Sequence, residues 1–176
     1  MRLLSRQSWN PLALIATART LIRRPGLLVP HVAVNNVDAL DFDALRAAGV
    51  ASIIFDKDNT LTAPYVDTAH VDVSDAIKRA KDAFGEDNCI VLSNSAGSGD
   101  DAPEYKAALK CEAALGLRVA RHPDAQKPQC LSQVVASLPS SDASTVAVVG
   151  DRLSTDILAA NEIGALSVHT RPLDTK

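Results

Sequence analysis

Short runs of consecutive apolar residues alternate along this chain with longer segments in which apolar residues recur every three or four positions. Such short runs predict strands that are buried on both faces, and the periodic segments predict helices that pack against them. We expect strands at 52–55, 89–92, 117–120, 146–149 and 166–170. Strands that alternate with helices indicate an α/β fold with a parallel sheet and right-handed crossover connections.

Residues that start and stop helices divide the segments between these strands. Predicted helices cover 10–24, 41–48, 104–115, 129–138 and 155–163, and a further one runs from Asp72 or Ser74 to Phe84. Asp41 is a suitable N-cap for the second helix, and a glycine directly follows four of the six. The segment 95–103, rich in Gly, Ser and Asp, is expected to form a flexible loop.

The first predicted helix combines an apolar arc with arginines and has no acidic residue. Asn10 is a suitable N-cap, Pro11 a suitable first residue, and Pro25 ends the helix. This pattern is typical of an amphipathic helix in a membrane interface. A helix docked on its own domain and a cleaved, arginine-rich targeting segment share the pattern, and both stay open. We therefore expect an interfacial helix at 1–26 and a single domain at 27–176.

Composition and charge narrow the class of protein and its partners. The chain has 176 residues, enough for one sizeable core, and its 47% hydrophobic and 3% aromatic content predicts an aliphatic core. Residues 1–37 carry five arginines and no acid, whereas 38–176 carry 13 basic and 21 acidic side chains. The basic end can meet an anionic phospholipid surface. The acidic body lacks basic stripes interleaved with aromatic residues, so we expect no nucleic-acid partner.

Two aspartates one residue apart, Asp56 and Asp58, follow the apolar run that ends at Phe55. A buried strand would deliver both carboxylates at its carboxyl end, where open α/β sheets bind their ligands. Adjacent carboxylates repel each other and need a cation, a proton or strong hydrogen-bond donors. Mg²⁺ supplies that charge and favours carboxylate oxygens together with a substrate phosphate. The alternative is an exposed acidic turn after a strand.

Polar residues also follow two other predicted strands. Ser93 and Asn94 come directly after the second strand, and Asp151 and Asp156 follow the fourth. Lys127 lies between these segments, after a short basic stretch. The three segments can complete a site around the aspartate pair. As alternatives, the serine caps a turn, the lysine is a solvated loop residue, and the last aspartate caps the following helix.

In chain order the polar segments are strand-Asp-x-Asp, strand-Ser, a lone Lys, and strand-Gly-Asp-x4-Asp. Over about residues 51–170, this ordered set resembles the haloacid dehalogenase (HAD) superfamily of aspartate-nucleophile phosphotransferases. Longer strings are similar to one subfamily, the mitochondrial phosphatidylglycerophosphate phosphatases of fungi and plants, which have shorter bacterial relatives. These strings are Leu-Leu-Val-Pro at 27–30, Asp-Lys-Asp-Asn at 56–59, Leu-Ser-Asn-Ser-Ala-Gly-Ser at 92–98, Arg-His at 121–122 and Gly-Asp-Arg-Leu-Ser-Thr-Asp-Ile-Leu-Ala-Ala-Asn at 150–161.

The resemblance implies a HAD-type, Rossmann-like parallel sheet flanked by helices. Only 34 residues separate Asp58 from Ser93, and 33 separate Ser93 from Lys127, which leaves no room for a large cap domain. An uncapped site can accept a phosphate on a large or membrane-embedded molecule, whereas capped relatives typically enclose small soluble substrates. The chain departs from the family in carrying Gln126 before the lysine, where paired lysines are usual, and in ending soon after its last predicted strand.

The resemblance also implies a two-step mechanism. Asp56 would attack the phosphorus to form an aspartyl-phosphate, and Asp58 would protonate the leaving alcohol and then take a proton from water. Mg²⁺ would bind the Asp56 side chain, the Asp58 backbone carbonyl and Asp151. Asp156 would act through water or by orienting the other metal ligands.

The resemblance implies that the remaining motifs bind the phosphate. Ser93 and Lys127, with backbone N–H groups around Asn94, would hold the phosphoryl oxygens. Weaker candidates, each equally consistent with a structural role, are Arg152, Arg121 and His122 for a lipid headgroup and Tyr65 for the rim of the site.

The resemblance implies phosphatidylglycerophosphate as substrate and phosphatidylglycerol, the precursor of cardiolipin, as product. It places the protein peripherally on the matrix face of the mitochondrial inner membrane. Two alternatives stay open: a phosphatase for soluble sugar or nucleotide phosphates, and a non-catalytic, membrane-bound HAD scaffold. Turnover of soluble esters that is unaffected by loss of residues 1–24 favours the first, and lipid binding without turnover favours the second.

Overall fold

The computed structural model describes Ala18 and residues 23–173 of the chain. Within that part of the chain, no helix has both the length and the apolar character needed to cross a membrane. The helix predicted at 1–26 lies almost wholly outside the described residues. Its place at a membrane interface and the boundary at residue 26 therefore stay predictions.

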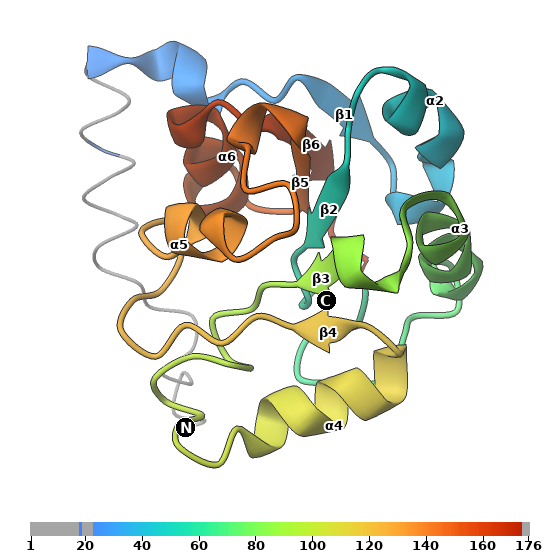
Figure 1. The fold of residues 1–176 in the computed structure, drawn as a ribbon, viewed down its shortest axis with the longest axis vertical. Coiled ribbons are helices and arrows are strands. Elements are labelled where there is room, and N and C mark those ends of the chain that lie inside the picture. The colour runs from blue at the N-terminus through green and yellow to red at the C-terminus, as the bar shows by residue number, and fades with distance from the viewer. Residues whose placement is uncertain (1–17, 19–22, 174–176) are drawn as a thin grey trace, which may run out of the picture.

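A parallel sheet, six-stranded over the described residues, forms the centre of the fold. In chain order the strands are β1 (Val32–Val34), β2 (Ser52–Phe55), β3 (Cys89–Val91), β4 (Arg118–Val119), β5 (Val146–Gly150) and β6 (Leu166–Thr170). They lie side by side in the order β1-β6-β5-β2-β3-β4, and every neighbouring pair is parallel (Figure 1). The chain moves outward from β2 to β4 and then returns to β5, so β2 and β5 flank the point where its direction reverses. Open α/β sheets bind ligands at such a point, beyond the carboxyl ends of the strands.

Helices cover both faces of the sheet (Figure 1). They are α2 (Phe42–Ala47), α3 (Ser74–Phe84), α4 (Lys106–Leu115), α5 (Leu131–Ala136) and α6 (Leu158–Ile163). Successive side chains of a strand point to opposite faces. Ile53 and Phe55 of β2 accordingly pack in one cluster with α2, α3 and α4, whereas Ile54 packs in a second with α5 and α6. Because β2 and β5 are buried along their whole length, polar chemistry is confined to the strand ends.

The predicted α/β class, the parallel sheet and all five predicted strands are confirmed, with strand bounds that differ by at most one residue. The connections from β2 to β3 and from β3 to β4 hold α3 and α4, with no large cap domain between them. Asp41 caps α2 as expected, accepting a hydrogen bond from Ala44 N–H at 2.9 Å.

Two features depart from the sequence prediction. The strand β1 was not predicted, because a run of three residues is too short to show the pattern of a strand. It forms because β6 offers an open edge, and Val32 pairs in register with Val168. The helix predicted at 155–163 instead begins as a π-helical turn, Leu153–Ile157, before α6.

Candidate active site

Polar residues from four separate segments meet beyond the carboxyl ends of β2, β3 and β5. The backbone N–H of Asp56 donates to Val149 O at 2.8 Å, so the pairing of β2 with β5 extends as far as this aspartate. A cavity of about 60 Å³ opens beside it. Its lining residues are Asp56, Asp58, Asn59, Pro64, Tyr65, Ser93, Asn94, Ser95, Lys127 and Arg152.

Lys127 is the cationic centre of the site. Its ammonium group pairs with Asp56 Oδ1 and, at 2.6 Å, with Asp156 Oδ1. The lysine is 4% exposed and Asp156 only 1%, so water barely screens these ion pairs. Burial alone would lower the pKa of Lys127, but Asp156 and Asp56 outweigh it and raise that pKa above its ordinary value. The lysine therefore stays charged, which does not fit a solvated loop residue.

Three carboxylates surround a position that suits a divalent cation. Ligand atoms of Asp56, Asp151 and Asp156 lie within 4.8 Å of one another. Asp151 Oδ1 is buried and has no hydrogen-bond partner among the described residues. Since every donor is a carboxylate oxygen, the set fits a hard cation better than a thiophilic metal.

The electrostatics of the three carboxylates point to the same conclusion. Burial raises the pKa of Asp56 to about 7; Lys127 opposes this shift and Asp156 reinforces it. Burial, followed by repulsion from Asp156, also raises the pKa of Asp151 to about 6. One lysine thus offsets only part of the negative charge that three ionised carboxylates bring. A bound divalent cation would supply the rest.

The position of Asp156 depends on a glycine in β5. A Cβ atom added to Gly150 would lie 2.5 Å from Asp156 Cγ, which is closer than real Cβ atoms approach. The carboxylate also accepts from the backbone N–H of Arg152 at 3.2 Å, so it lies inside the π-helical turn and closes it. The small residue before Asp151 therefore lets both aspartates reach the same site.

Asp58 points into the cavity and is held by three donors. Its Oδ1 accepts from Lys57 Nζ at 3.1 Å and from Tyr65 N–H at 3.3 Å, and its Oδ2 accepts from Ser95 Oγ at 3.5 Å. Lys57 is 3% exposed and also donates to Val66 O at 2.7 Å. Sequence reasoning missed Lys57 and Ser95. Their only signal was adjacency, a lysine between the two aspartates and a hydroxyl two residues after Ser93.

The loop after β3 presents Ser93 and Asn94 to the cavity. Ser93 Oγ accepts from the backbone N–H groups of Ser95 and Ala96 at 3.2 and 3.4 Å, so the serine both caps its own turn and lines the cavity. Asn94 Oδ1 accepts from Lys127 N–H at 2.9 Å. This bond ties the β3 loop to the loop that carries the lysine.

Of the three residues predicted to contact a headgroup, only Arg152 lines the cavity. Arg152 lines the cavity and is exposed. Arg121 does not line it, because its guanidinium binds Glu112 through two bonds of 2.8 and 3.0 Å and lies over the ring of Tyr105. His122 is fully buried beneath the cavity loops. Contacts with a headgroup stay predictions for all three.

The fold and these side chains together define a class. The chain is an open α/β protein whose site, at the reversal of strand order, combines carboxylates for a cation with a lysine and a serine suited to an anion. The family model for mitochondrial PGP phosphatase matches residues 12–172. The chain therefore belongs to the mitochondrial PGP phosphatase family.

Curated relatives come from algae, plants and yeast. The chain is similar to phosphatidylglycerophosphate phosphatase 1, chloroplastic, of Chlamydomonas reinhardtii, with 38% identity over 149 residues, covering 85% of this chain and 55% of the relative. It is 35% identical over 167 residues to phosphatidylglycerophosphate phosphatase 1, chloroplastic/mitochondrial, of Arabidopsis thaliana, covering 95% and 47%. It is 32% identical over 152 residues to the mitochondrial phosphatidylglycerophosphatase GEP4 of Saccharomyces cerevisiae, covering 84% and 77%. The chain spans about half the length of the first two relatives. No solved structure matches the chain.

Proposed function

We propose that this protein is a Mg²⁺-dependent phosphatase that converts phosphatidylglycerophosphate to phosphatidylglycerol, in the route to cardiolipin. We further propose that it acts peripherally on the matrix face of the mitochondrial inner membrane. The observation that carries the proposal is the buried group of Asp56, Lys127, Asp151 and Asp156 beyond the end of β2. The names of the curated relatives support the substrate, and those of yeast and Arabidopsis support the compartment.

The residues of the site support a covalent mechanism in two displacements. An Asp56 oxygen attacks the phosphorus, the bond from phosphorus to the ester oxygen breaks, and Asp58 gives its proton to the leaving alkoxide. Water then attacks the aspartyl-phosphate and Asp58 takes its proton. The bond from phosphorus to Asp56 breaks, which releases inorganic phosphate and restores the Asp56 carboxylate and the protonated Asp58.

Other residues hold the charges in place during these displacements. Lys127, already paired with Asp56, orients that carboxylate and faces the phosphoryl oxygens together with Ser93. Mg²⁺ held by Asp56, Asp151 and the Asp58 carbonyl, with Asp156 orienting its ligands, would neutralise charge on the transferred group. Lys57, Tyr65 and Ser95 keep the Asp58 carboxylate turned toward the leaving oxygen.

The size and openness of the site support a lipid substrate. The cavity, at about 60 Å³, is small compared with a phospholipid. It therefore suits the phosphoryl group, while the rest of a large substrate lies outside. The described connections after β2 and β3 form no large cap domain over the cavity, so a headgroup at a bilayer surface can reach Asp56 without leaving the membrane.

Phosphate release from phosphatidylglycerophosphate in mixed micelles, with and without Mg²⁺, tests the proposal beside a panel of soluble phosphate monoesters. We expect metal-dependent turnover with a strong preference for the lipid. Efficient metal-dependent turnover of a sugar or nucleotide phosphate instead would keep the chemistry and overturn the lipid substrate. Lipid binding without any turnover would identify a scaffold.

A further inference from the structure

His122 is a fully buried imidazole between the two loops that form the phosphate side of the cavity. Its Nε2 lies 2.8 Å from Ser93 O, in the loop after β3. Its Nδ1 lies 2.7 Å from Ala125 O, two residues before Lys127. The backbone N–H of His122 also donates to Gly97 O at 2.8 Å, so this one residue contacts the β3 loop twice and the lysine loop once.

Both ring contacts end on carbonyl oxygens, and this geometry favours a proton on each ring nitrogen. A carbonyl oxygen only accepts hydrogen bonds, and a neutral imidazole has one N–H and one bare nitrogen. In a neutral ring, the nitrogen without a proton would lie less than 3 Å from a carbonyl oxygen. Both atoms are hydrogen-bond acceptors, so they would repel each other. The two contacts are both hydrogen bonds only when both nitrogens carry a proton. His122 is then a buried cation beneath the cavity.

The bond to Ser93 O also sets the direction of the next backbone N–H. The peptide between Ser93 and Asn94 is trans, so its C=O and N–H point in opposite directions. The C=O points at the buried His122 ring, which does not line the cavity, whereas Ser93 and Asn94 do. The Asn94 N–H is thereby directed toward the cavity. A carbonyl that accepts from a cation also polarises its peptide, which strengthens that N–H as a donor.

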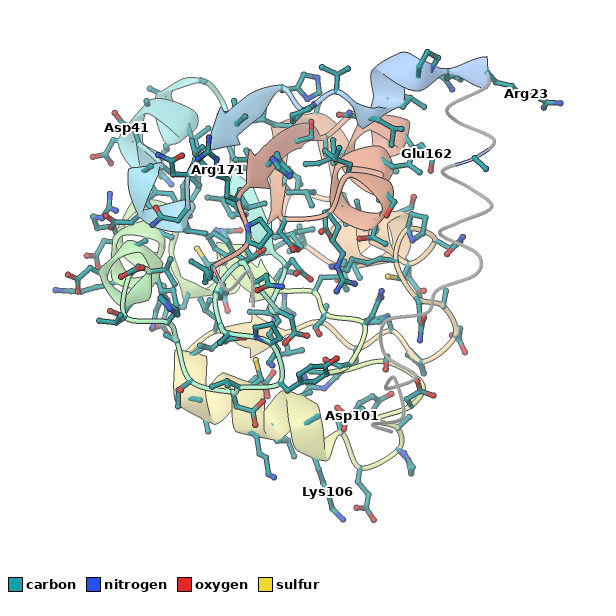
Figure 2. All side chains as sticks on the ribbon, turned by 180° about the vertical axis from the view of Figure 1, so that it is seen from behind. Arg23, Asp41, Asp101, Lys106, Glu162 and Arg171 are labelled. Carbon is teal, nitrogen blue, oxygen red and sulfur yellow. The ribbon has the colours of Figure 1, made fainter. Side chains whose placement is uncertain are left out.

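The surroundings of the β3 loop leave it little freedom to adopt another path. Gly97 has a φ of +82°, and a Cβ atom there would lie 2.2 Å from Ala120 O. Asp101, labelled near the start of α4 in Figure 2, accepts from Gly97 N–H at 3.0 Å. Asn94 Oδ1 joins the same loop to Lys127 N–H at 2.9 Å. The loop is thus fixed at its far end by α4, and at the cavity by His122 and Asn94.

We infer that His122 is a positioning residue whose doubly protonated ring directs the Asn94 N–H into the cavity and holds Ser93 and Lys127 around one phosphoryl group. This inference rests on the proposed function, because it concerns the phosphate contacts of that site. It differs from the headgroup contact predicted from the sequence, since it gives the buried ring a role beneath the cavity and not in contact with the substrate.

Inorganic phosphate is the probe that tests this role directly. His122→Gln keeps one donor, and it should weaken phosphate binding on the order of tenfold. KM for a soluble phosphate monoester should rise by a similar factor. His31→Gln is the matched control, because His31 bonds Ser167 at the opposite ends of β1 and β6 from the cavity. It should leave phosphate affinity unchanged. A His122→Gln protein that loses thermal stability but keeps wild-type phosphate affinity overturns the inference.

A second measurement needs no variant and stands even if His122→Gln does not fold. In the wild-type protein labelled with ¹⁵N-histidine, the His122 ring should show two protonated nitrogens at neutral pH. A single protonated nitrogen overturns the inference. Neither readout depends on the lipid, so a protein that fails to hydrolyse phosphatidylglycerophosphate refutes the proposed function while both His122 measurements still decide their own question.

Discussion

At the scale of single residues, the site is a balance of buried charge. Lys127 is in contact with two carboxylates, and Asp151 has an oxygen without a partner among the described residues. An unpartnered, buried carboxylate oxygen is costly, and proteins retain such groups mainly where they bind something. The charges that destabilise the metal-free site are therefore the groups that we propose for metal and phosphate binding.

Asp56→Asn should abolish turnover, with a loss of at least about 10³-fold, because an amide cannot act as the nucleophile. The fold should persist, since the amide has nearly the same shape and Lys127 keeps Asp156 as a partner. Phosphate release and circular dichroism measure the two effects. Retained turnover in this variant would refute the nucleophile assignment. Asp43→Asn, an exposed change in α2, is a matched control that should leave turnover at the wild-type rate.

Stability of the metal-free protein should fall as pH rises from about 4 to about 7. The folded-state pKa values of Asp56 and Asp151, about 7 and about 6, lie above the ordinary value of 3.8. The folded protein therefore holds protons in this range that the unfolded chain has already lost, and their contribution to stability disappears as they dissociate.

Asp151→Asn should reduce the loss of stability between pH 5 and pH 8 by on the order of 1 kcal/mol, because that interval covers about one pKa unit below the Asp151 pKa of about 6 and one unit corresponds to about 1.4 kcal/mol. Denaturant unfolding with EDTA at pH 5 and pH 8 measures the difference. Added Mg²⁺ should stabilise the wild-type protein at pH 8 more than the variant. Equal pH dependence in both proteins would contradict the role of Asp151 in the buried charge cluster.

At the scale of elements, the ends of β2, β3 and β5 act together because adjacent parallel strands present their carboxyl ends at one edge. The close approach of β5 to the π-helical turn that follows it requires a residue without a side chain at the end of β5. Gly150 ends β5 directly under the π-helical turn, and Asp156 occupies the space where a Cβ would lie. The turn, rather than a regular helix start, brings the Asp156 carboxylate beside Lys127.

Gly150→Ala should displace Asp156 and lower kcat about tenfold to a hundredfold, because small displacements in a site are costly. It should also destabilise the fold by about 1–3 kcal/mol through overpacking. Steady-state kinetics and thermal unfolding test this pair of effects. Gly164→Ala is a useful comparison, since it follows α6, has open space around its Cβ position and lies away from the cavity. There the strain of a positive φ should reduce stability alone. Wild-type kcat in Gly150→Ala would show that Asp156 is not needed in its present place.

At the scale of the whole molecule, charge is divided between an arginine-rich first segment and an acidic body. An anionic bilayer should attract the first and repel the second. We therefore expect productive binding to depend on the predicted interfacial helix, and hydrolysis of a soluble ester to depend on the domain alone.

Deletion of residues 1–24 should weaken binding to anionic liposomes by at least about tenfold, yet change hydrolysis of a soluble ester less than twofold. Co-sedimentation and phosphate release measure the two effects. Raising the salt concentration should reproduce part of the binding loss, because screening weakens attraction to anionic lipids. Unchanged liposome binding after the deletion would refute the interfacial helix.

The sequence by itself determined the α/β class, five of the strands and the residues at their ends. Those features depend on local patterns: an apolar run followed by Asp56 or Ser93 predicts a strand and a polar end wherever the run lies. The tertiary structure alone decided which partners those side chains meet. Lys127 binds Asp156, Arg121 turns to Glu112 instead of the cavity, and His122 is buried between two loops. These contacts join residues from different elements, so their energies depend on the packing of the whole sheet and its loops, which no local pattern records.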